Sequence, residues 1–294
     1  MFKAWQIFLF SLIPLAIVFA GVISGAFRGV DSAREPTPTP VGGVSTGDDD
    51  GHAHDPATSL SYEAATGSRR IDGAAADWAG VPALDVTLES LDGARELSVN
   101  LQVSFDAANI YVLVSVPDDY NATPGEHEAS GALAMLWAID EEAGPHMGTD
   151  GVRLTTSLGM VDIWHWEIDC EPGVVSGGQD RSEDGDDPDC NLDDEYATTP
   201  FERNDDAGDN LLTGVYDHTG RASGEDAAGT WYWEISRPLA TGDAQDAQFA
   251  AGGAAKLALA YWDPDQTADG WTDSGHLQSA EVGWIIVQVP ASLP

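Results

Sequence analysis

The stretch Glu96–Asp119, ELSVNLQVSFDAANIYVLVSVPDD, decides the fold. Apolar and polar residues alternate along residues 96–105, and a second run rich in β-branched and aromatic residues fills 109–119. The junction between the two runs, Asp106–Asn109, is typical of a tight turn. The stretch therefore predicts two antiparallel strands joined by a short hairpin loop.

Further runs of this kind follow along the chain. They read ALAMLWAID at 132–140, VDIWHWEI at 161–168, GTWYWEISRPL at 229–239, AKLALAYWD at 255–263 and VGWIIVQV at 282–289. No segment after residue 61 has a helical period over three turns, so we predict an all-β protein, an antiparallel β-sandwich. We interpret the acidic, strand-poor stretch at about 170–229 as an insertion on this one domain.

The N-terminal region differs in composition from the rest. Trp5–Phe27 is an uncharged apolar run of 23 residues, which is long enough to span a bilayer. We predict a transmembrane or signal helix at 1–28, with an uncleaved anchor favoured. A flexible acidic linker rich in Pro and Thr follows at 29–61, and the folded domain occupies 62–294. Together with the cysteines, this order predicts a domain on the extracytoplasmic face of the cell membrane, or a secreted one if the helix is cleaved.

The charge of the chain is strongly acidic. Fifty Asp and Glu residues stand against twelve Lys and Arg, a formal net charge of −38. Such a field repels nucleic acid, which we exclude as a partner. We interpret the surface as an adaptation to high salt, as in halophilic proteins, with a basic partner or bound metal ions as the alternative.

Cys170 and Cys190 are the two cysteines of the chain. One pair in an exported protein predicts a disulfide, which here would close the acidic loop and contribute about 3 kcal/mol on the loop-entropy model. A thiolate pair for a metal is the alternative, although no Cys-x-x-Cys spacing supports it. The absence of Cys-x-x-Cys-His excludes a c-type haem.

Calcium is a second metal hypothesis. Asp180 and Asp184 stand on either side of Ser182, with Asp186 close behind, so this run supplies oxygen ligands around a Gly turn. The twelfth position is Asn191, which lacks the bidentate carboxylate of an EF-hand. A solvated loop is the alternative interpretation.

The segment Gly144–Cys170 combines groups that suit iron. Met147 offers a thioether, and Trp164 and His165 lie on the predicted strand that follows. Thioether and imidazole are both axial ligands of haem iron. Because His165 alternates with Trp164 and Trp166, it points away from both indole rings.

The order of motifs resembles a known family. Ile71-Asp72-Gly73 with Asp77-Trp78 resembles the opening of DOMON-like and family 9 carbohydrate-binding sandwiches. The later motifs are similar to the haem-binding domain of the gamma subunits of ethylbenzene dehydrogenase and dimethylsulfide dehydrogenase. They are MG at 147–148, VDIWHWE at 161–167, WEISRPL at 233–239, DAQF at 246–249, LALAYWD at 257–263 and GHLQSAEVGW at 275–284.

That resemblance implies an immunoglobulin-like sandwich with one non-covalent haem b. It implies Met147 as one axial ligand and His276, at or next to the family's Lys position, as the other. Lys256 is the alternative second ligand, provided that its amine is deprotonated. Arg237 is a candidate partner of a haem propionate, against a structural salt bridge, and Trp164 and His165 are candidate haem contacts.

The predicted function is electron transfer by an extracytoplasmic b-type haem protein. It would be a subunit or partner of a molybdopterin-type oxidoreductase, and a carrier rather than an enzyme, since no nucleophile elbow, zinc-protease motif or phosphate loop occurs. The alternative is a carbohydrate-binding or sensing sandwich of the DOMON or family 9 type without haem. A calcium-stabilised adhesion module is a third possibility.

Overall fold

The computed structural model describes residues 59–90, 93–122, 130–145, 159–168, 175–176, 191–198, 203–206, 208–265, 276–279 and 283–294. All of them belong to one compact unit, Ala53–Pro294. Within these ranges no helix has the length and apolar character needed to cross a membrane. Several predicted features lie outside the described residues: the anchor Trp5–Phe27, Met147, the pair Cys170 and Cys190, and the calcium candidates Asp180, Asp184 and Asp186.

Strands make up nearly all of the regular structure in the described part. In chain order they are β1 (Leu60–Glu63), β2 (Ala65–Thr66), β3 (Leu84–Ser90), β4 (Glu96–Phe105), β5 (Asn109–Asp119), β6 (Ala132–Ala138), β7 (Val161–Glu167), β8 (Val175–Ser176), β9 (Asn191–Ala197), β10 (Arg203–Asp205), β11 (Thr213–His218), β12 (Ala228–Pro238), β13 (Ala254–Trp262), β14 (Leu277–Gln278) and β15 (Ile285–Gln288). The short 3-10 helices η1 (Ala75–Trp78) and η4 (Arg221–Ser223) accompany them. The all-β prediction is confirmed.

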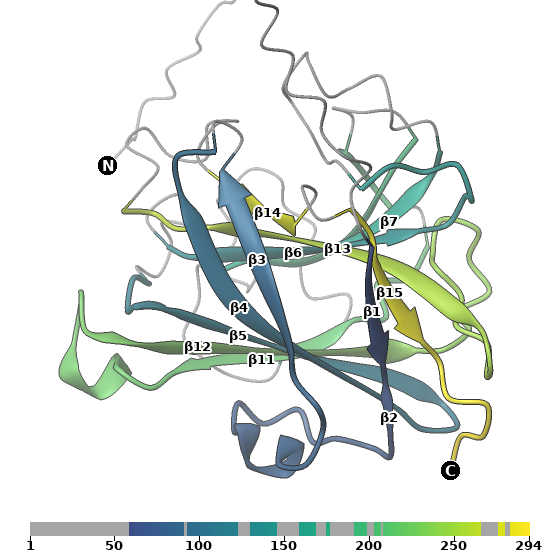
Figure 1. Ribbon diagram of the computed structural model, residues 1–294, viewed down its shortest axis with the longest axis horizontal. Coiled ribbons are helices and arrows are strands. Elements are labelled where there is room, and N and C mark those ends of the chain that lie inside the picture. Colours follow the sequence, from purple (N-terminus) through teal and green to yellow (C-terminus); the bar gives the residue numbers. More distant parts are fainter. Residues whose placement is uncertain are drawn as a thin grey trace, which may run out of the picture. The chain divides into compact units, whose positions relative to one another are not determined.

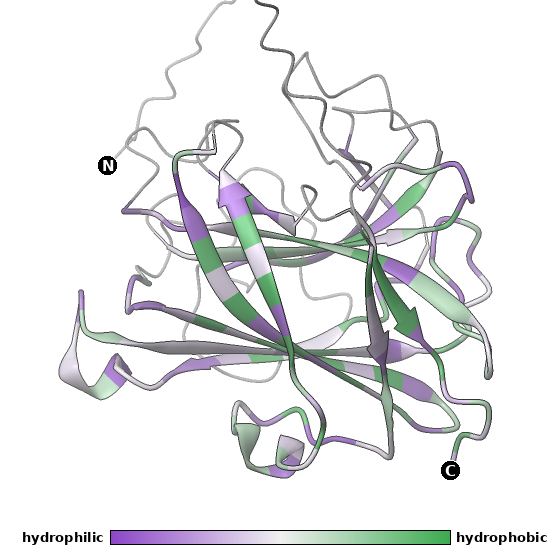
Figure 2. Cartoon of the chain, in the orientation of Figure 1, coloured by the Kyte–Doolittle hydropathy of each residue, from purple (hydrophilic) through white to green (hydrophobic). Residues whose placement is uncertain are grey.

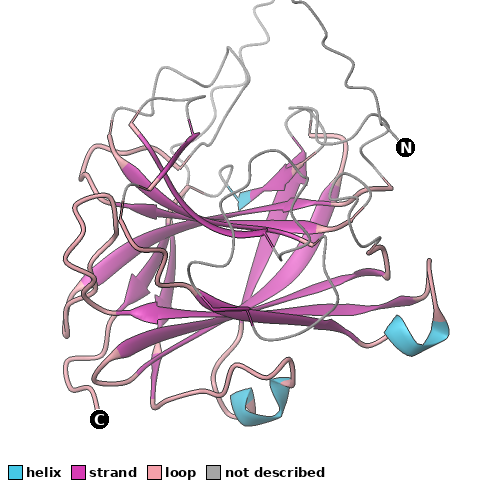
Figure 3. Ribbon diagram, turned by 180° about the vertical axis from the view of Figure 1, so that it is seen from behind, coloured by secondary structure: helices cyan, strands magenta, loops and turns pink. Residues whose placement is uncertain are grey.

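The described strands form one curled sheet in the order β10-β9-β7-β6-β13-β14-β3-β4-β5-β12-β11-β8. It folds back on itself, so that β6, β7 and β13 lie in one layer and β5, β11 and β12 in the other, while β3 and β4 cross between them (Figure 1; Figure 3 gives the opposite view). The predicted hairpin is present, because β4 pairs with β5 from Asn100↔Ser115 to Phe105↔Ile110. The sheet is mostly antiparallel, but β1 runs parallel to β15 and β2 runs parallel to β4.

The core lies between the two layers. Along β4 buried and partly exposed residues alternate, and Figure 2 shows hydrophobic and hydrophilic segments alternating along β3 and β4. Large aromatic rings fill the interior, where Trp166 packs edge-on against Trp233 at 5.7 Å and against Tyr216 at 5.6 Å between ring centroids. Trp164 and Trp166 are fully buried in this core, and strand alternation places them on the opposite face of β7 from His165.

The interpretation of 170–229 as a strand-poor insertion is wrong for the residues described there. β9 pairs with β7 over the whole length of both strands, and β11 pairs with β12 from Thr213 to His218. Leu192 of β9 and Tyr216 of β11 belong to the main core. The acidic residues of β9 masked the strand in the sequence, because strand patterns normally carry few consecutive carboxylates.

The opening motif at 71–78 has a structural role. The carboxylate of Glu234 on β12 accepts hydrogen bonds from the backbone N–H groups of Asp72 (2.9 Å) and Gly73 (2.8 Å) and from Nε1 of Trp78 (2.8 Å). Gly73 has a φ of 76°, a left-handed conformation that favours glycine. Burial raises the pKa of Glu234, and the three N–H donors oppose that rise. The motif therefore attaches the start of the domain to the layer that contains β5, β11 and β12.

Candidate binding site

The outer face of the β9-β7-β6-β13 layer carries a floor of small side chains. Strand register places Ala134 of β6 opposite His165 of β7, and Ala260 of β13 opposite Ala134. Ala132, Ala134, Ala260 and Trp262 form one cluster of buried apolar side chains. The alanines carry no polar side-chain atoms, so the larger side chains at the edges of this floor determine its chemistry.

Trp262 lies between two histidines on this floor. Its ring centroid is 5.5 Å from that of His165 and 5.1 Å from that of His276, with interplanar angles of 58° and 31°. The exposed fractions are 9% for Trp262, 2% for His165 and 4% for His276. The three rings thus form an enclosed aromatic wall.

Charged groups surround His165. Its Nδ1 is 2.7 Å from Nη1 of Arg203 and 3.6 Å from a carboxylate oxygen of Glu195, and its Nε2 is 3.5 Å from Glu167. Arg203 also pairs with Glu195 at 3.2 Å. His165, Glu195 and Asp193 could each offer one ligand atom within 4.8 Å of the others, but the guanidinium of Arg203 already contacts two of these three residues. Nδ1 of His165, one of the candidate ligand atoms, thus already has a partner in Nη1 of Arg203.

Gln278 adds a hydrogen-bonding group to the same face. It pairs with Ala260 in the sheet, so its side chain shares the outer face with the alanine floor. Gln278 is 3% exposed, and its Nε2 has no hydrogen-bond partner in the described part of the molecule. A buried amide donor that finds no protein acceptor points to a ligand or a water molecule. We call Trp262, His165, His276, Gln278, Glu167 and Arg203 the outer-face site.

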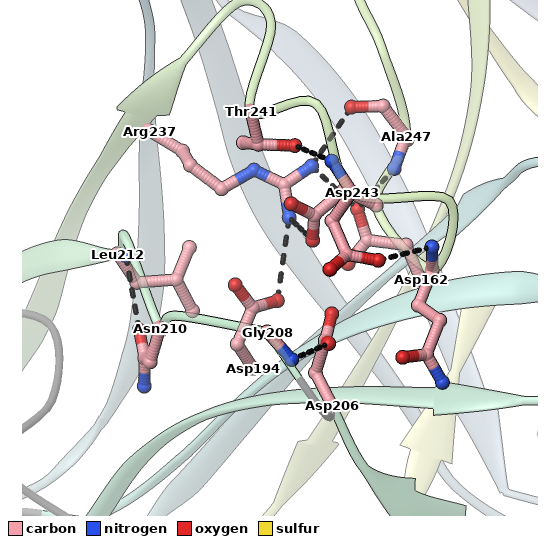
Figure 4. Close-up of polar contacts among 12 residues, drawn as sticks. Asp162, Asp194, Asp206, Gly208, Asn210, Leu212, Arg237, Thr241, Asp243 and Ala247 are labelled. Carbon is pink, nitrogen blue, oxygen red and sulfur yellow. Dashed lines mark hydrogen bonds and ion pairs between the residues drawn. The ribbon is translucent and has the colours of Figure 1, made fainter.

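Arg237 lies elsewhere, on the inner face of β12. Its Nη2 is 2.6 Å from Asp162, and its Nη1 is 2.8 Å from Asp246 and 3.3 Å from Asp194 (Figure 4). Its guanidinium also lies over Trp164, 4.8 Å from the ring centroid. We call these three carboxylates and Arg237 the acid cluster. It joins the two layers, so the structural salt bridge, rather than a free partner for a haem propionate, describes Arg237 in this structure.

Burial changes the protonation of the acid cluster. Burial, and then the charge of Asp162, raises the pKa of Asp194 to about 8, against the attraction of Arg237. Burial also raises the pKa of Asp162 to about 6, although the charge of Arg237 opposes the rise. One guanidinium therefore does not fully compensate three buried carboxylates.

Lys256 lies at the opposite end of the outer face from His276. Its Nζ donates a hydrogen bond to the backbone oxygen of Glu141 at 2.7 Å. Trp284 lies at this end too, where its Nε1 donates to the backbone oxygen of Ala143 at 3.1 Å. Lys256 therefore does not share a site with Trp262.

The described residues among those predicted to bind haem do not gather in one pocket, and Met147 lies outside the described ranges. Trp164 and Arg237 lie inside the sandwich. His165 and His276 share a neighbour, Trp262, on the outer face, and haem binding stays a prediction.

Sequence reasoning missed the acid cluster, although the alternation of the strands carries a signal for it. Asp162 is two residues from Trp164, and Arg237 is two residues from Ile235, so each charged residue lies on the same face of its strand as that apolar neighbour. If the apolar neighbours face the core, the two charged residues must face it too and need partners of opposite charge. The partnership with Asp194 and Asp246 required the tertiary structure.

Comparisons with known proteins give limited similarity. No family model matches the sequence, and no curated protein matches it. Among solved structures, a carbohydrate-binding module of family 9 from Caldicellulosiruptor kristjanssonii, in complex with glucose, is 11% identical, with a TM-score of 0.43 over 79% of this chain and 96% of that chain. The same module with cellotriose gives 10% identity and a TM-score of 0.44 over 79% of this chain and 94% of that chain. At these values the likeness assigns neither a family nor a ligand.

Proposed function

We propose that this protein is a non-catalytic binding protein that holds an uncharged carbohydrate in the outer-face site. The observation that carries the proposal is the buried, unpartnered amide nitrogen of Gln278 beside the alanine floor that leads to Trp262. A pyranose presents an apolar C–H face that packs on an aromatic ring and hydroxyl groups that need donors and acceptors. Binding sites generally combine such an apolar wall with a few convergent polar groups.

The polar groups of the site match neighbouring sugar hydroxyls. Glu167 supplies acceptors, Gln278 Nε2 supplies a donor, and Arg203 presents several N–H groups in a fixed fork. The side chain of Arg203 is 44% exposed, whereas that of Glu195 is 7% exposed, so Arg203 forms the solvent side of this group. A net charge of −38 repels uronic and sulfated sugars, which favours a neutral ligand.

The same residues support a haem less well. Both ring nitrogens of His165 face charged side chains, and carboxylates close to a haem would oppose its negatively charged propionates. Haem chemistry here would rest on His276 together with a residue outside the described ranges.

Isothermal titration of the full chain with cellotriose and other neutral oligosaccharides in high salt tests the proposal. Trp262→Ala should weaken the binding that the native chain shows by at least about 2 kcal/mol, because it removes the ring that the sugar packs against. Trp284→Ala is the matched control, since Trp284 is also a tryptophan of the outer face, 8% exposed, at the opposite end. Equal losses in both variants, or no binding of any sugar by the native chain, would reject the proposal.

An absorbance spectrum of the same protein, produced with haem available, tests the haem-binding function that the sequence predicts. A Soret band with sharp reduced α and β bands that disappears in His276→Ala would establish a b-type cytochrome instead.

We further propose that residues 5–27 hold the binding domain on the extracytoplasmic side of the membrane, which protease protection in intact cells would test.

A further inference from the structure

The acid cluster holds more negative charge than its own residues neutralise. Asp162, Asp194 and Asp246 face the single guanidinium of Arg237, an excess of two negative charges when all three carboxylates are ionised. Asp206 contacts Asp246, and Asp243 adds further repulsion. All three inner carboxylate side chains are at most 2% exposed, so water screens this charge little.

Two oxygens of the cluster have no hydrogen-bond partner among the residues that the structure describes. Asp162 binds Arg237 and the N–H of Ala247 through Oδ2, while its Oδ1 has no hydrogen-bond partner. Asp194 reaches Arg237 through Oδ1, while its Oδ2 has none. Each unpaired buried carboxylate oxygen costs free energy, so the two oxygens call for a cation or a proton.

We propose that the acid cluster binds one hard divalent cation, Ca²⁺, between Asp162, Asp194 and Asp246. Each of these three residues offers one carboxylate oxygen within 4.8 Å of the other two. Ca²⁺ accepts irregular arrangements of oxygen ligands, whereas Mg²⁺ demands near-ideal octahedral geometry and gives up its water ligands reluctantly, so a buried group of this kind favours Ca²⁺. The donors are all carboxylate oxygens, which select hard cations rather than zinc or copper.

A pocket lies next to the acid cluster. A pocket of about 310 Å³ adjoins the cluster and is lined by Gly208, Asp209, Leu211, Thr241, Gly242, Asp243 and Asp246. Asp246 belongs both to the pocket wall and to the cluster, so the pocket adjoins the inner carboxylates.

This site is distinct from the outer-face site and from the acidic run at Asp180–Asp186. It lies between the layers, where β7, β9 and β12 supply Asp162, Asp194 and Arg237. Binding would therefore stabilise the sandwich itself, whether or not the protein binds a carbohydrate.

Thermal unfolding of the full chain, stripped of metal by a chelator, tests the inference. At about pH 8 and constant ionic strength, CaCl₂ should raise the unfolding temperature in a saturable way, and MgCl₂ should do so less. In Asp194→Asn the apparent Ca²⁺ affinity should fall at least about tenfold, because a charged ligand is lost. Asparagine has the same shape as aspartate and relieves repulsion, so this variant should fold.

The control carries Asp180→Asn, Asp184→Asn and Asp186→Asn together, which should leave the calcium response unchanged. Loss of the response in this control would place the ion in the acidic run and overturn the inference. A native chain without a saturable calcium response, or an Asp194→Asn variant that keeps the full response, would overturn it as well.

Discussion

The two faces of β7 share one backbone but have different surroundings. The inner face places Asp162, Trp164 and Trp166 between the layers, where the acid cluster and the tryptophan core hold the two layers together. The outer face presents His165 and Glu167 beside the alanine floor. Both faces are buried, and the outer one combines aromatic rings and ionisable groups with the amide donor of Gln278.

This difference shows that burial alone does not distinguish residues that stabilise the fold from residues that could bind a ligand. Inner-face groups fill space and bind each other across the sandwich, so a change there acts on folding. Outer-face groups meet beside small side chains, so a change there should act mainly on what the protein binds. The predictions below test that division.

The largest expected effect on stability follows the loss of the Arg237 guanidinium from the acid cluster. Arg237→Met keeps an unbranched apolar stem but leaves Asp162, Asp194 and Asp246 without their shared guanidinium. We expect the free energy of unfolding in urea to fall by about 3–5 kcal/mol, as when one partner of a buried ion pair is removed.

Arg70→Met is the control for that change. Arg70 also pairs with an aspartate, Asp72 at 3.0 Å, but its side chain is 80% exposed. We expect a change within about 0.5 kcal/mol. Similar values for the two arginine variants would contradict the role of the acid cluster in joining the layers.

The pH dependence of stability should report on Asp194. Its pKa of about 8 in the folded protein lies above its ordinary value of 3.8. The stability that its bound proton confers is therefore complete below about pH 4 and is lost as the pH rises through about 8. The groups that face it are Arg237, Asp162, Asp246 and Asp206.

In metal-free buffer, Asp194→Asn should remove this part of the pH dependence. We expect the native chain to lose at least about 1.4 kcal/mol more than the variant between about pH 5 and pH 8, the equivalent of one pKa unit. Urea unfolding at both pH values measures the difference. Parallel curves for the two proteins would show that Asp194 is ionised throughout.

The smallest effect on stability should come from the outer face. Arg203→Ala removes a side chain that is 44% exposed and pairs with Glu195 at 3.2 Å. We expect a loss of about 0.2–1 kcal/mol in urea unfolding, because solvent screens this pair. A loss as large as that of Arg237→Met would mean that the outer face is structural too.

Local pattern was sufficient to predict much of the fold. The hairpin at 96–119 and the strands of the runs at 132–140, 161–168, 229–239, 255–263 and 282–289 occur where alternation predicts them. The pattern failed at β9, where Asp193, Asp194 and Glu195 follow one another. Pairing with β7 makes this segment a strand although its composition is that of a loop.

The candidate site was predicted only in part. His165 and His276 were singled out, and they meet at Trp262. Gln278 was missed, because a lone glutamine in a short apolar segment carries no signal until the strand register places it over Ala260.

By itself the sequence determined the all-β class, the acidic surface and the opposite orientation of neighbouring side chains, because charge and strand alternation are local properties. Only the tertiary structure decided which side chains meet. Arg237 is separated from Asp162 by 75 residues and from Asp194 by 43, and it binds both because the sheet curls until β12 faces β7 and β9. Such contacts depend on how distant strands pair and pack, which no local pattern specifies.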